Sequence, residues 1–448
     1  MSTKELTVGN PLKLLILFMF PIFIGNIFQQ FYHLIDTLIV GRVIGIEALA
    51  AVGVTGPLIF FVISFIFAAT QGFSVVTAQQ FGARDYDMLR KSFAASIILS
   101  TVLTVVITAI SVPFTKQMLV FLQTPKNILE GADTYLFIMF AGIIATIFYN
   151  LSSNIVRALG DSKTPLYFLI VSTVLNLIMD VLFVIKFKWG IAGVGWATIV
   201  AQAVSTILCV WYMMIKFPIL HLKKEDWKIP LPFLYEHLRV GIPMGIQMSV
   251  LSLGILALQY VLNSFGSTAI AAFTTACRIE QIFLQLFVAL GAAIAVYTAQ
   301  NFGAKKLSRI KEGVKSSIYI SLVIYAVSVL CIWYYSTQMI SWFITETNEE
   351  LTAFANEYLH IVMIFFIFLG ILMIFRNVLQ GMGSVMAPLS SGVAELIART
   401  ACAFIMGAYF GYTGVCYAAP MAWIAASVVL YVGYKISLKK QLKILKQR

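Results

Sequence analysis

Residues Thr77–Arg84 read Thr-Ala-Gln-Gln-Phe-Gly-Ala-Arg, and residues Thr298–Lys305 read Thr-Ala-Gln-Asn-Phe-Gly-Ala-Lys. The shift that aligns these two stretches also aligns Pro21 with Pro243, within one residue. Matches that recur at one offset along a chain are typical of an internal structural repeat. The sequence therefore predicts that one unit has been duplicated and that the fold has two related halves.

Long apolar segments fill most of the chain. Of the 448 residues, 60% are hydrophobic and 11% are charged. A membrane-spanning helix needs about 20 mostly apolar residues, and soluble domains do not carry so many such runs. The first run is far longer than the apolar core of a signal peptide, so we expect it to remain in the mature protein. We predict an all-α membrane protein with twelve transmembrane helices, near residues 12–40, 48–71, 93–113, 130–156, 164–187, 191–217, 236–263, 269–297, 314–337, 352–380, 386–410 and 413–435.

The duplication divides these helices into two lobes of six. Because six is an even number, both copies enter the membrane from the same side, and a pseudo-twofold axis along the membrane normal should relate them. Residues 218–235 are polar, basic and contain three prolines, which is typical of a linker. We predict an N-terminal lobe at 1–217, a cytoplasmic linker at 218–235 and a C-terminal lobe at 236–448.

The distribution of the basic residues behind the net charge of +12 indicates which side of the membrane each loop is on. Most of the 31 Lys and Arg residues fall in the segments that are cytoplasmic if the N-terminus is inside. That asymmetry follows the positive-inside rule and places both termini in the cytoplasm. We therefore expect a multi-pass protein of the cell (inner or plasma) membrane, with the lipid bilayer as its partner and no nucleic acid.

One carboxylate stands out in the first span. The stretch Asn26–Gly41 places Asp36 inside an otherwise apolar run. An ionised Asp near the middle of a bilayer costs about 2.5–3.5 kcal/mol on insertion scales, so it survives where it meets a partner, a cation or a proton. Asp36 is the first candidate functional residue.

Three further polar residues are predicted at a similar depth. Asp180 lies near the outer end of the fifth span, as Asp36 does in the first, and Asn176 precedes Asp180 by one turn on the same face. Thr198, in the sixth span, reaches the depth of Asn176. Oxygens and one amide suit Na⁺ or a proton shared between two carboxyls. The alternative is that the two Asp residues only bind backbone groups, but Lys and Arg occur only at the ends of the first six spans, too far along the helices for a salt bridge.

Other polar or adaptable side chains are candidates for substrate contact or coupling. His33 precedes Asp36 by three residues and is either a proton relay or a structural histidine. Met and aromatic residues make adaptable surfaces for varied apolar ligands, although membrane helices contain many that only pack. The candidates in the two halves are Gln30, Tyr149, Asn150, Asn154, Met179 and Gln281.

Four charged residues in the spans of the second half form a different set of candidates. Glu395 and Arg399 have the favourable i, i+4 order for a helical ion pair, and Arg278 and Glu280 lie in the eighth span. We interpret these four as a structural pairing network; alternatively, Arg278 or Glu280 lines a cleft and responds to substrate charge.

Each half also has one proline within its first helix. Pro21 and Pro243 each remove a backbone hydrogen bond and should bend the helix, either as a static kink or as a hinge.

These residues are similar to those of one transporter family. The duplicated twelve-helix plan, the first-helix run from Asn26 to Gly41, the paired loop motif, the connector Arg157–Pro165 and the pair Asn176 and Asp180 resemble the multidrug and toxic compound extrusion (MATE) transporters. The resemblance covers almost the whole chain and is greatest to the branch related to the DNA-damage-inducible subgroup.

The resemblance implies a secondary active efflux antiporter. It would export lipophilic, often cationic, small molecules in exchange for H⁺ or Na⁺, by alternating access and with no further cofactor. In that branch Asp36, Asn176, Asp180 and Thr198 would form the cation site. Another branch uses a carboxylate early in the seventh helix, where this chain has Gln247. We expect a monomer.

Three alternatives remain open. A lipid-linked glycan flippase of the same superfamily would need cationic residues in its cleft. A membrane enzyme would need a nucleophile with a base, or metal ligands, at one depth, and His33 is the one histidine predicted inside a span and away from the linker and the helix ends. A channel would show flux that neither saturates nor depends on an opposing ion gradient. We therefore predict a transporter and no enzyme.

Overall fold

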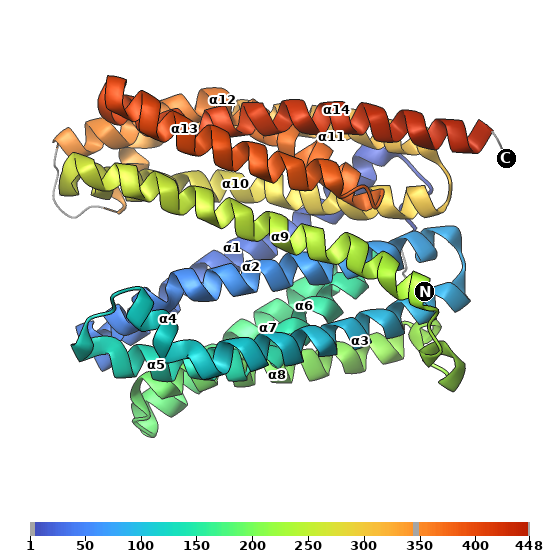
Figure 1. Cartoon of the computed structure of the whole chain (residues 1–448), viewed down its shortest axis with the longest axis horizontal. Coiled ribbons are helices and arrows are strands. Elements are labelled where there is room, and N and C mark those ends of the chain that lie inside the picture. The colour runs from blue at the N-terminus through green and yellow to red at the C-terminus, as the bar shows by residue number, and fades with distance from the viewer. Residues whose placement is uncertain (1–4, 344–348, 447–448) are drawn as a thin grey trace. The chain divides into compact units, whose positions relative to one another are not determined.

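The chain folds almost entirely into helices (Figure 1). The structure is a computed structural model that describes residues 5–343 and 349–446, except for the side chains of residues 33, 34 and 444–446. The α-helices are α1 (Pro11–Ile39), α2 (Ile46–Ala83), α3 (Tyr86–Ser111), α4 (Thr115–Phe121), α5 (Lys126–Ala141), α6 (Ile143–Ala158), α7 (Lys163–Asp180), α8 (Gly190–Lys216), α9 (Leu231–Leu262), α10 (Gly266–Gly303), α11 (Leu307–Ser341), α12 (Glu349–Gly381), α13 (Met386–Cys416) and α14 (Ala418–Lys446).

Short helices of other types interrupt or join these elements. The π-helices are η1 (Val40–Ile44) and η3 (Val181–Lys186), and the 3₁₀ helices are η2 (Val112–Phe114), η4 (Pro218–Leu220), η5 (Lys224–Trp227) and η6 (Asn263–Phe265). The linker therefore contains η4 and η5.

The described residues contain ten helical segments that are long and apolar enough to cross a membrane, and the bent pair α5 and α6 makes an eleventh. One of the ten, Leu231–Gly303, has 73 residues and contains both α9 and α10. These two helices are separated by η6. Gly266, the first residue of α10, has a φ of +86°, a conformation that glycine adopts at little energetic cost. Counted with α9 and α10 apart, the described spans agree with the twelve predicted from sequence.

The helices group into two compact units. The first contains Ile24–Gly245, and the second contains Leu6–Phe23 together with the chain from Ile246 onward. The first half of α1 therefore belongs to the second unit, and the first half of α9 belongs to the first unit. In both helices the division falls two residues after the internal proline, Pro21 or Pro243. The units thus differ from the sequence-based division into 1–217, 218–235 and 236–448 by this exchange of helix halves.

In the first unit, α2 packs against α3, α5 and α6, while α8 packs against α5, α6 and α7. Close packing needs small residues: a Cβ on Gly72 of α2 would lie 2.5 Å from the Cα of Gly241 on α9. Contacts of this kind let membrane helices approach closely. Side chains from the C-terminal parts of α1 and α7 and from the first half of α8 meet in the polar cluster described below.

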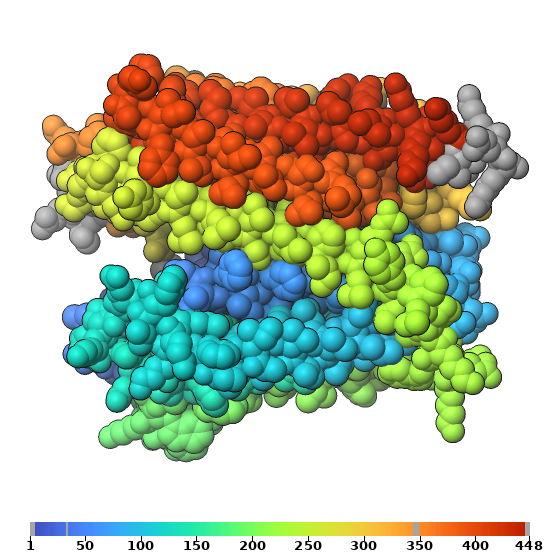
Figure 2. Space-filling model, viewed as in Figure 1, coloured from blue at the N-terminus to red at the C-terminus, as the bar shows by residue number. Residues whose placement is uncertain are grey.

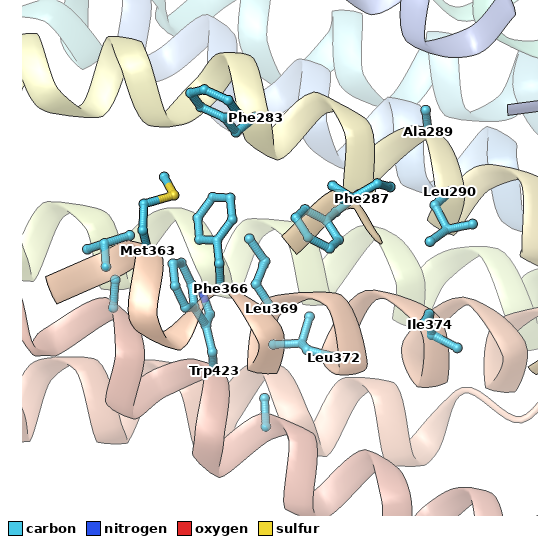
Figure 3. Close-up of a cluster of buried hydrophobic side chains, with 14 of the residues drawn as sticks. Phe283, Phe287, Ala289, Leu290, Met363, Phe366, Leu369, Leu372, Ile374 and Trp423 are labelled. Carbon is cyan, nitrogen blue, oxygen red and sulfur yellow. The ribbon is translucent and has the colours of Figure 1, made fainter. Parts of the chain in front are cut away.

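The second unit has the larger apolar core. Aromatic side chains of α10, α12 and α14 meet in its centre, where Phe287 and Trp423 each lie edge to face against Phe366 (Figure 3). Leu15, Phe18 and Ile22 of α1 are buried in the same core. On the surface of this unit α13 and α14 lie side by side (Figure 2).

The second copy of the duplicated motif holds the segment before α1, the helix whose first half belongs to the second unit. Gln300 Oε1 accepts a hydrogen bond from the backbone N–H of Leu6 at 2.9 Å, and Asn301 Nδ2 donates to the carbonyl of Leu6 at 3.1 Å. Arg309 adds a hydrogen bond to the carbonyl of Gly9 at 2.9 Å. The segment that leads into α1 is thus held by residues of the second copy of the motif.

The first unit holds the start of α9 by a comparable network. Thr77 Oγ1 lies 2.9 Å from Ser92 Oγ, and Ser92 Oγ lies 2.8 Å from Nε2 of the buried His237. The other ring nitrogen of His237 lies 2.9 Å from the carbonyl of Phe233, one turn earlier in α9. Both copies of the motif therefore anchor a helix whose second half belongs to the other unit.

Candidate ion-binding site

The structure brings Asp36 of α1 and Asp180 of α7 together in the first unit. Their carboxyl groups lie within hydrogen-bond reach of each other. Two ionised carboxylates have only acceptor atoms, so such a contact requires a shared proton or a cation between them. The Oδ1 atoms of Asp36 and Asp180 are both buried and have no hydrogen-bond partner among the described residues.

Asn176 connects this pair to neighbouring helices. In the orientation that satisfies both ends of its amide, the nitrogen donates to Asp180 Oδ2 at 3.0 Å and to Tyr32 Oη at 3.1 Å, and the oxygen accepts from the backbone N–H of Thr198 at 3.1 Å. The hydroxyl of Thr198 donates to the carbonyl of Val194, one turn earlier, at 3.1 Å. All four predicted cation-site residues therefore lie in one cluster.

Two tyrosines belong to the same cluster. Tyr32 precedes Asp36 by one turn of α1 and also hydrogen-bonds with Thr198, and the buried Tyr135 of α5 lies close to both carboxyls. The i, i+4 spacing of Tyr32 and Asp36 was a signal that the sequence offered and that our prediction did not use. Tyr135 carries no local signal, because its place depends on how α5 packs.

Both carboxylates stand next to a π-helix. Asp180 is the last residue of α7 and directly precedes η3, and Asp36 precedes η1 by four residues. The two π-helices contact each other and both contact α8. A π-turn is rare and leaves backbone groups outside the regular ladder, which makes it common at functional sites. Polar side chains and irregular backbone therefore meet at the same place.

The chemistry of this cluster fits a hard monovalent cation or a proton. Its side-chain donors are carboxyl, hydroxyl and amide groups, and hard cations prefer oxygen ligands. No described Lys or Arg forms an ion pair with Asp36 or Asp180. The unpartnered Oδ1 atoms would become satisfied if a proton or Na⁺ were bound.

The remaining candidates of the first unit have different surroundings. Asn154 is buried and its amide donates to Thr70 Oγ1 at 3.3 Å, and Asn150 donates to the carbonyl of Thr146 in its own helix at 2.8 Å. Tyr149 and Met179 are partly buried and Gln30 is exposed. The side chain of His33 lies outside the described part of the structure. The amides of Asn150 and Asn154 are thus engaged by protein groups.

The charged residues of the second unit pair differently from the prediction. Arg376 of α12, which the prediction left out, forms the close ion pair with Glu395, while Arg399 Nη2 lies 4.0 Å from the other carboxylate oxygen. Glu280 is buried and accepts a hydrogen bond from the Tyr358 hydroxyl at 2.7 Å. Arg278 and Gln281 are exposed, and Arg278 enters no ion pair among the described residues.

The fold and site define a polytopic helical membrane protein with an acid pair inside its first unit. The family model described as MatE matches residues 21–182 and 243–405, which repeats the internal duplication. The chain belongs to this family of transporters.

Relatives and solved structures agree with that membership. The chain is 28% identical to the "Probable multidrug resistance protein YpnP" of Bacillus subtilis over 453 residues, covering 100% of both chains. It is 29% identical to "Probable multidrug resistance protein YoeA" of the same organism, covering 95% of this chain and 94% of the relative. Its fold matches a structure described as an outward-facing conformation of a multidrug resistance MATE family transporter, with a TM-score of 0.91, 23% identity and coverage of 98% and 99%.

Proposed function

We propose that this protein is a secondary active efflux antiporter for lipophilic, often cationic, small molecules. The observation that carries the proposal is the buried acid pair, Asp36 and Asp180, in a chain that belongs to a transporter family and resembles multidrug resistance proteins over its full length. An acid pair that cannot hold two negative charges without a proton or cation is a natural coupling site.

The proposed cycle couples the state of this pair to the exposure of the cargo site. H⁺ or Na⁺ reaches the pair from outside and removes its repulsion, so that the cargo is released outward; the ion then leaves to the cytoplasm and new cargo binds. Coupling requires the ion to bind the two conformations with different affinity, and a tenfold difference corresponds to about 1.4 kcal/mol. Asn176, Thr198 and Tyr32 supply the remaining oxygen and amide groups around the ion.

The test is efflux of a fluorescent cation, ethidium, in everted vesicles with pH and Na⁺ gradients imposed separately. We expect one of the two gradients to drive transport, and we expect Asp36→Asn and Asp180→Asn to reduce it more than tenfold at equal protein levels. Glu130→Gln, which changes an exposed carboxylate of α5, is the matched control and should transport normally. Wild-type transport by both Asp variants against a gradient would show that the pair does not couple.

A further inference from the structure

A second polar cluster lies inside the second unit, on α9, α12 and α13. Arg376 is 7% exposed and pairs with Glu395, which is 4% exposed. Arg399 shares the same carboxylate from one turn further along α13. Two guanidinium groups therefore face one carboxylate.

Two glutamines extend this cluster. Gln380 follows Arg376 by one turn of α12, and its Nε2 donates to Gln247 Oε1 of α9 at 3.0 Å. Gln247 in turn packs on Gly392 of α13, where a Cβ would lie 3.1 Å from Gln247 Cγ. Gln247 is thus placed over the helix face that carries Glu395.

Two donors of the cluster have no acceptor within reach among the described residues. Arg376 Nε and Gln247 Nε2 are both buried and have no hydrogen-bond partner in the described part of the chain. Both are donors, and a buried donor without a partner destabilises the fold. Glu280, the other buried acid near Arg399, is held by Tyr358 and forms no ion pair within the described residues. A ligand with an anionic oxygen would satisfy both donors.

The duplication shows that this cluster is not a general packing feature. When Gly383–Pro388 is aligned with Gly160–Pro165, Arg376 falls on Ser153 and Arg399 falls on Asn176. When Pro243 is aligned with Pro21, Gln247 falls on Gly25. At these positions the first copy therefore has no arginine or glutamine, and it carries the acid pair on α1 and α7.

We propose that Gln247 and Arg376 bind the carboxylate, or another anionic oxygen, of a cargo molecule. The guanidinium and amide N–H groups suit two-point recognition of a carboxylate, as charge-assisted hydrogen bonds do elsewhere. Arg376 lies five residues before the end of α12, on the side that the sequence predicts to be cytoplasmic, where cargo would enter. This inference rests on the proposed efflux function and extends its cargo to zwitterionic compounds.

The test compares rhodamine B, a zwitterion with a free carboxylate, with its ethyl ester, a cation of the same shape. Both are measured as ion-driven uptake into everted vesicles. For Gln247→Leu and Arg376→Gln we expect the half-saturating concentration of rhodamine B to rise about tenfold, equal to about 1.4 kcal/mol, and that of the ester to stay within twofold. Ser391→Ala is the control, because its buried hydroxyl on α13 donates within its own helix to the carbonyl of Pro388 at 2.7 Å.

The outcomes separate this inference from the proposed function. If the wild-type protein moves neither dye under either gradient, the efflux function fails. If it moves the ester alone, the anion-binding role is wrong. The role is also wrong if Gln247→Leu and Arg376→Gln change the transport of both dyes equally or of neither; the two donors would then be satisfied by buried water or left without a partner. Gln247→Leu keeps nearly the same side-chain volume, so the comparison still stands if Arg376→Gln does not fold.

Discussion

Asn176 joins three parts of the acid-pair cluster, because its amide meets Asp180, Tyr32 and the backbone of Thr198. We expect Asn176→Leu to raise the ion concentration for half-maximal exchange more than tenfold, since it leaves Asp180 Oδ2 without its donor. Tyr32→Phe should raise it about fivefold, because one neutral hydrogen bond contributes about 1 kcal/mol. Ion-titrated ethidium efflux measures both values.

Tyr167→Phe, an exposed tyrosine on the same helix as Asn176, is the control for these variants. An effect of Tyr167→Phe as large as that of Tyr32→Phe would mean that the hydroxyl of Tyr32 has no particular role in ion binding.

Asp161 connects the Arg157–Pro165 motif to the helix that carries Asn176 and Asp180. It accepts hydrogen bonds from the backbone N–H of Thr164 at 3.1 Å and from its hydroxyl at 2.7 Å, and Lys216 Nζ lies 3.2 Å away. Burial raises the pKa of Asp161, but these hydrogen bonds and the nearby Lys216 outweigh it and hold the pKa below the usual value. Asp161 therefore fixes the start of α7 most strongly in its ionised form.

A pH dependence follows from the lowered pKa of Asp161. A group whose pKa is lower in the folded state contributes stability above its unfolded pKa, about 3.9, and loses it as pH falls through the folded value. We expect Asp161→Asn to lower the melting temperature in detergent at pH 7, by the equivalent of about 1–2 kcal/mol. The difference from wild type should shrink below about pH 4. A difference that is constant from pH 7 to pH 3 would contradict the charge as its cause.

The acid pair could be predicted from sequence because unpaired carboxylates in apolar runs are rare. The depth of each carboxylate in the membrane can also be estimated from the number of residues between it and the end of its span. The partners across helices could not be predicted in the same way. Arg376 pairs with Glu395 through the register of α12 against α13, which no local spacing encodes. Arg278 was expected in the same network and is exposed instead, because its face of α10 points away from Glu280 and the core.

Helix α9 approaches α2 closely because both have glycine at the contact. A Cβ on Gly241 would lie 2.4 Å from a ring carbon of Phe73 and 2.8 Å from the carbonyl oxygen of Ala69. We expect Gly241→Ala to destabilise the protein by about 1–3 kcal/mol, the usual cost of overpacking. Thermal unfolding in detergent measures this change. Gly53→Ala, where a Cβ would have no neighbour within 4 Å, should keep or raise the melting temperature, because alanine favours a helix more than glycine does. An equal loss at both positions would show that the loss at Gly241 does not come from overpacking.

The two prolines stand where α1 and α9 pass from one compact unit to the other. Alanine at either position can restore the hydrogen bond that proline removes, and proline inside a helix costs about 3 kcal/mol. We expect Pro21→Ala and Pro243→Ala to keep or raise thermal stability and to slow efflux several-fold, because a straight helix resists bending. The measurement pairs melting temperature with the initial rate of ethidium efflux.

Pro57→Ala is the matched control, since Pro57 lies inside α2, within one unit. If it slows efflux as much as Pro21→Ala does, the effect belongs to helix prolines in general and the hinge role is not supported.

Most helices could be predicted from apolar run length, but their interruptions could not. The predicted span 130–156 is two helices, α5 and α6, bent by 46° at Gly142. A Cβ at Gly142 would lie 2.6 Å from Ile199, so the bend is imposed by close packing against α8 and leaves no gap in the hydrophobic pattern. The short helix α4 was likewise not predicted, because its seven residues are too few for a span and it follows η2 directly after α3.

The exchange of helix halves makes each compact unit depend on both halves of the chain. Leu15, Phe18 and Ile22 of α1 are buried in the core of the second unit, and Phe233, His237 and Gly241 of α9 belong to the first. Each unit would lose packing contacts without the helix segment that the other half of the chain supplies to it. Such contacts are the main source of helix association in a membrane. The duplication alone would have predicted two self-sufficient lobes.

A chain divided within the linker tests this dependence. We expect fragments 1–228 and 229–448 to accumulate poorly when expressed singly, and to form a transport-competent complex when expressed together, because only then does Leu6–Phe23 reach the core of the second unit. Immunoblot levels and ethidium efflux from cells report both results. A stable, monodisperse 229–448 fragment with a melting temperature near that of the intact protein would contradict the expectation, because the second unit would then fold without the first half of α1.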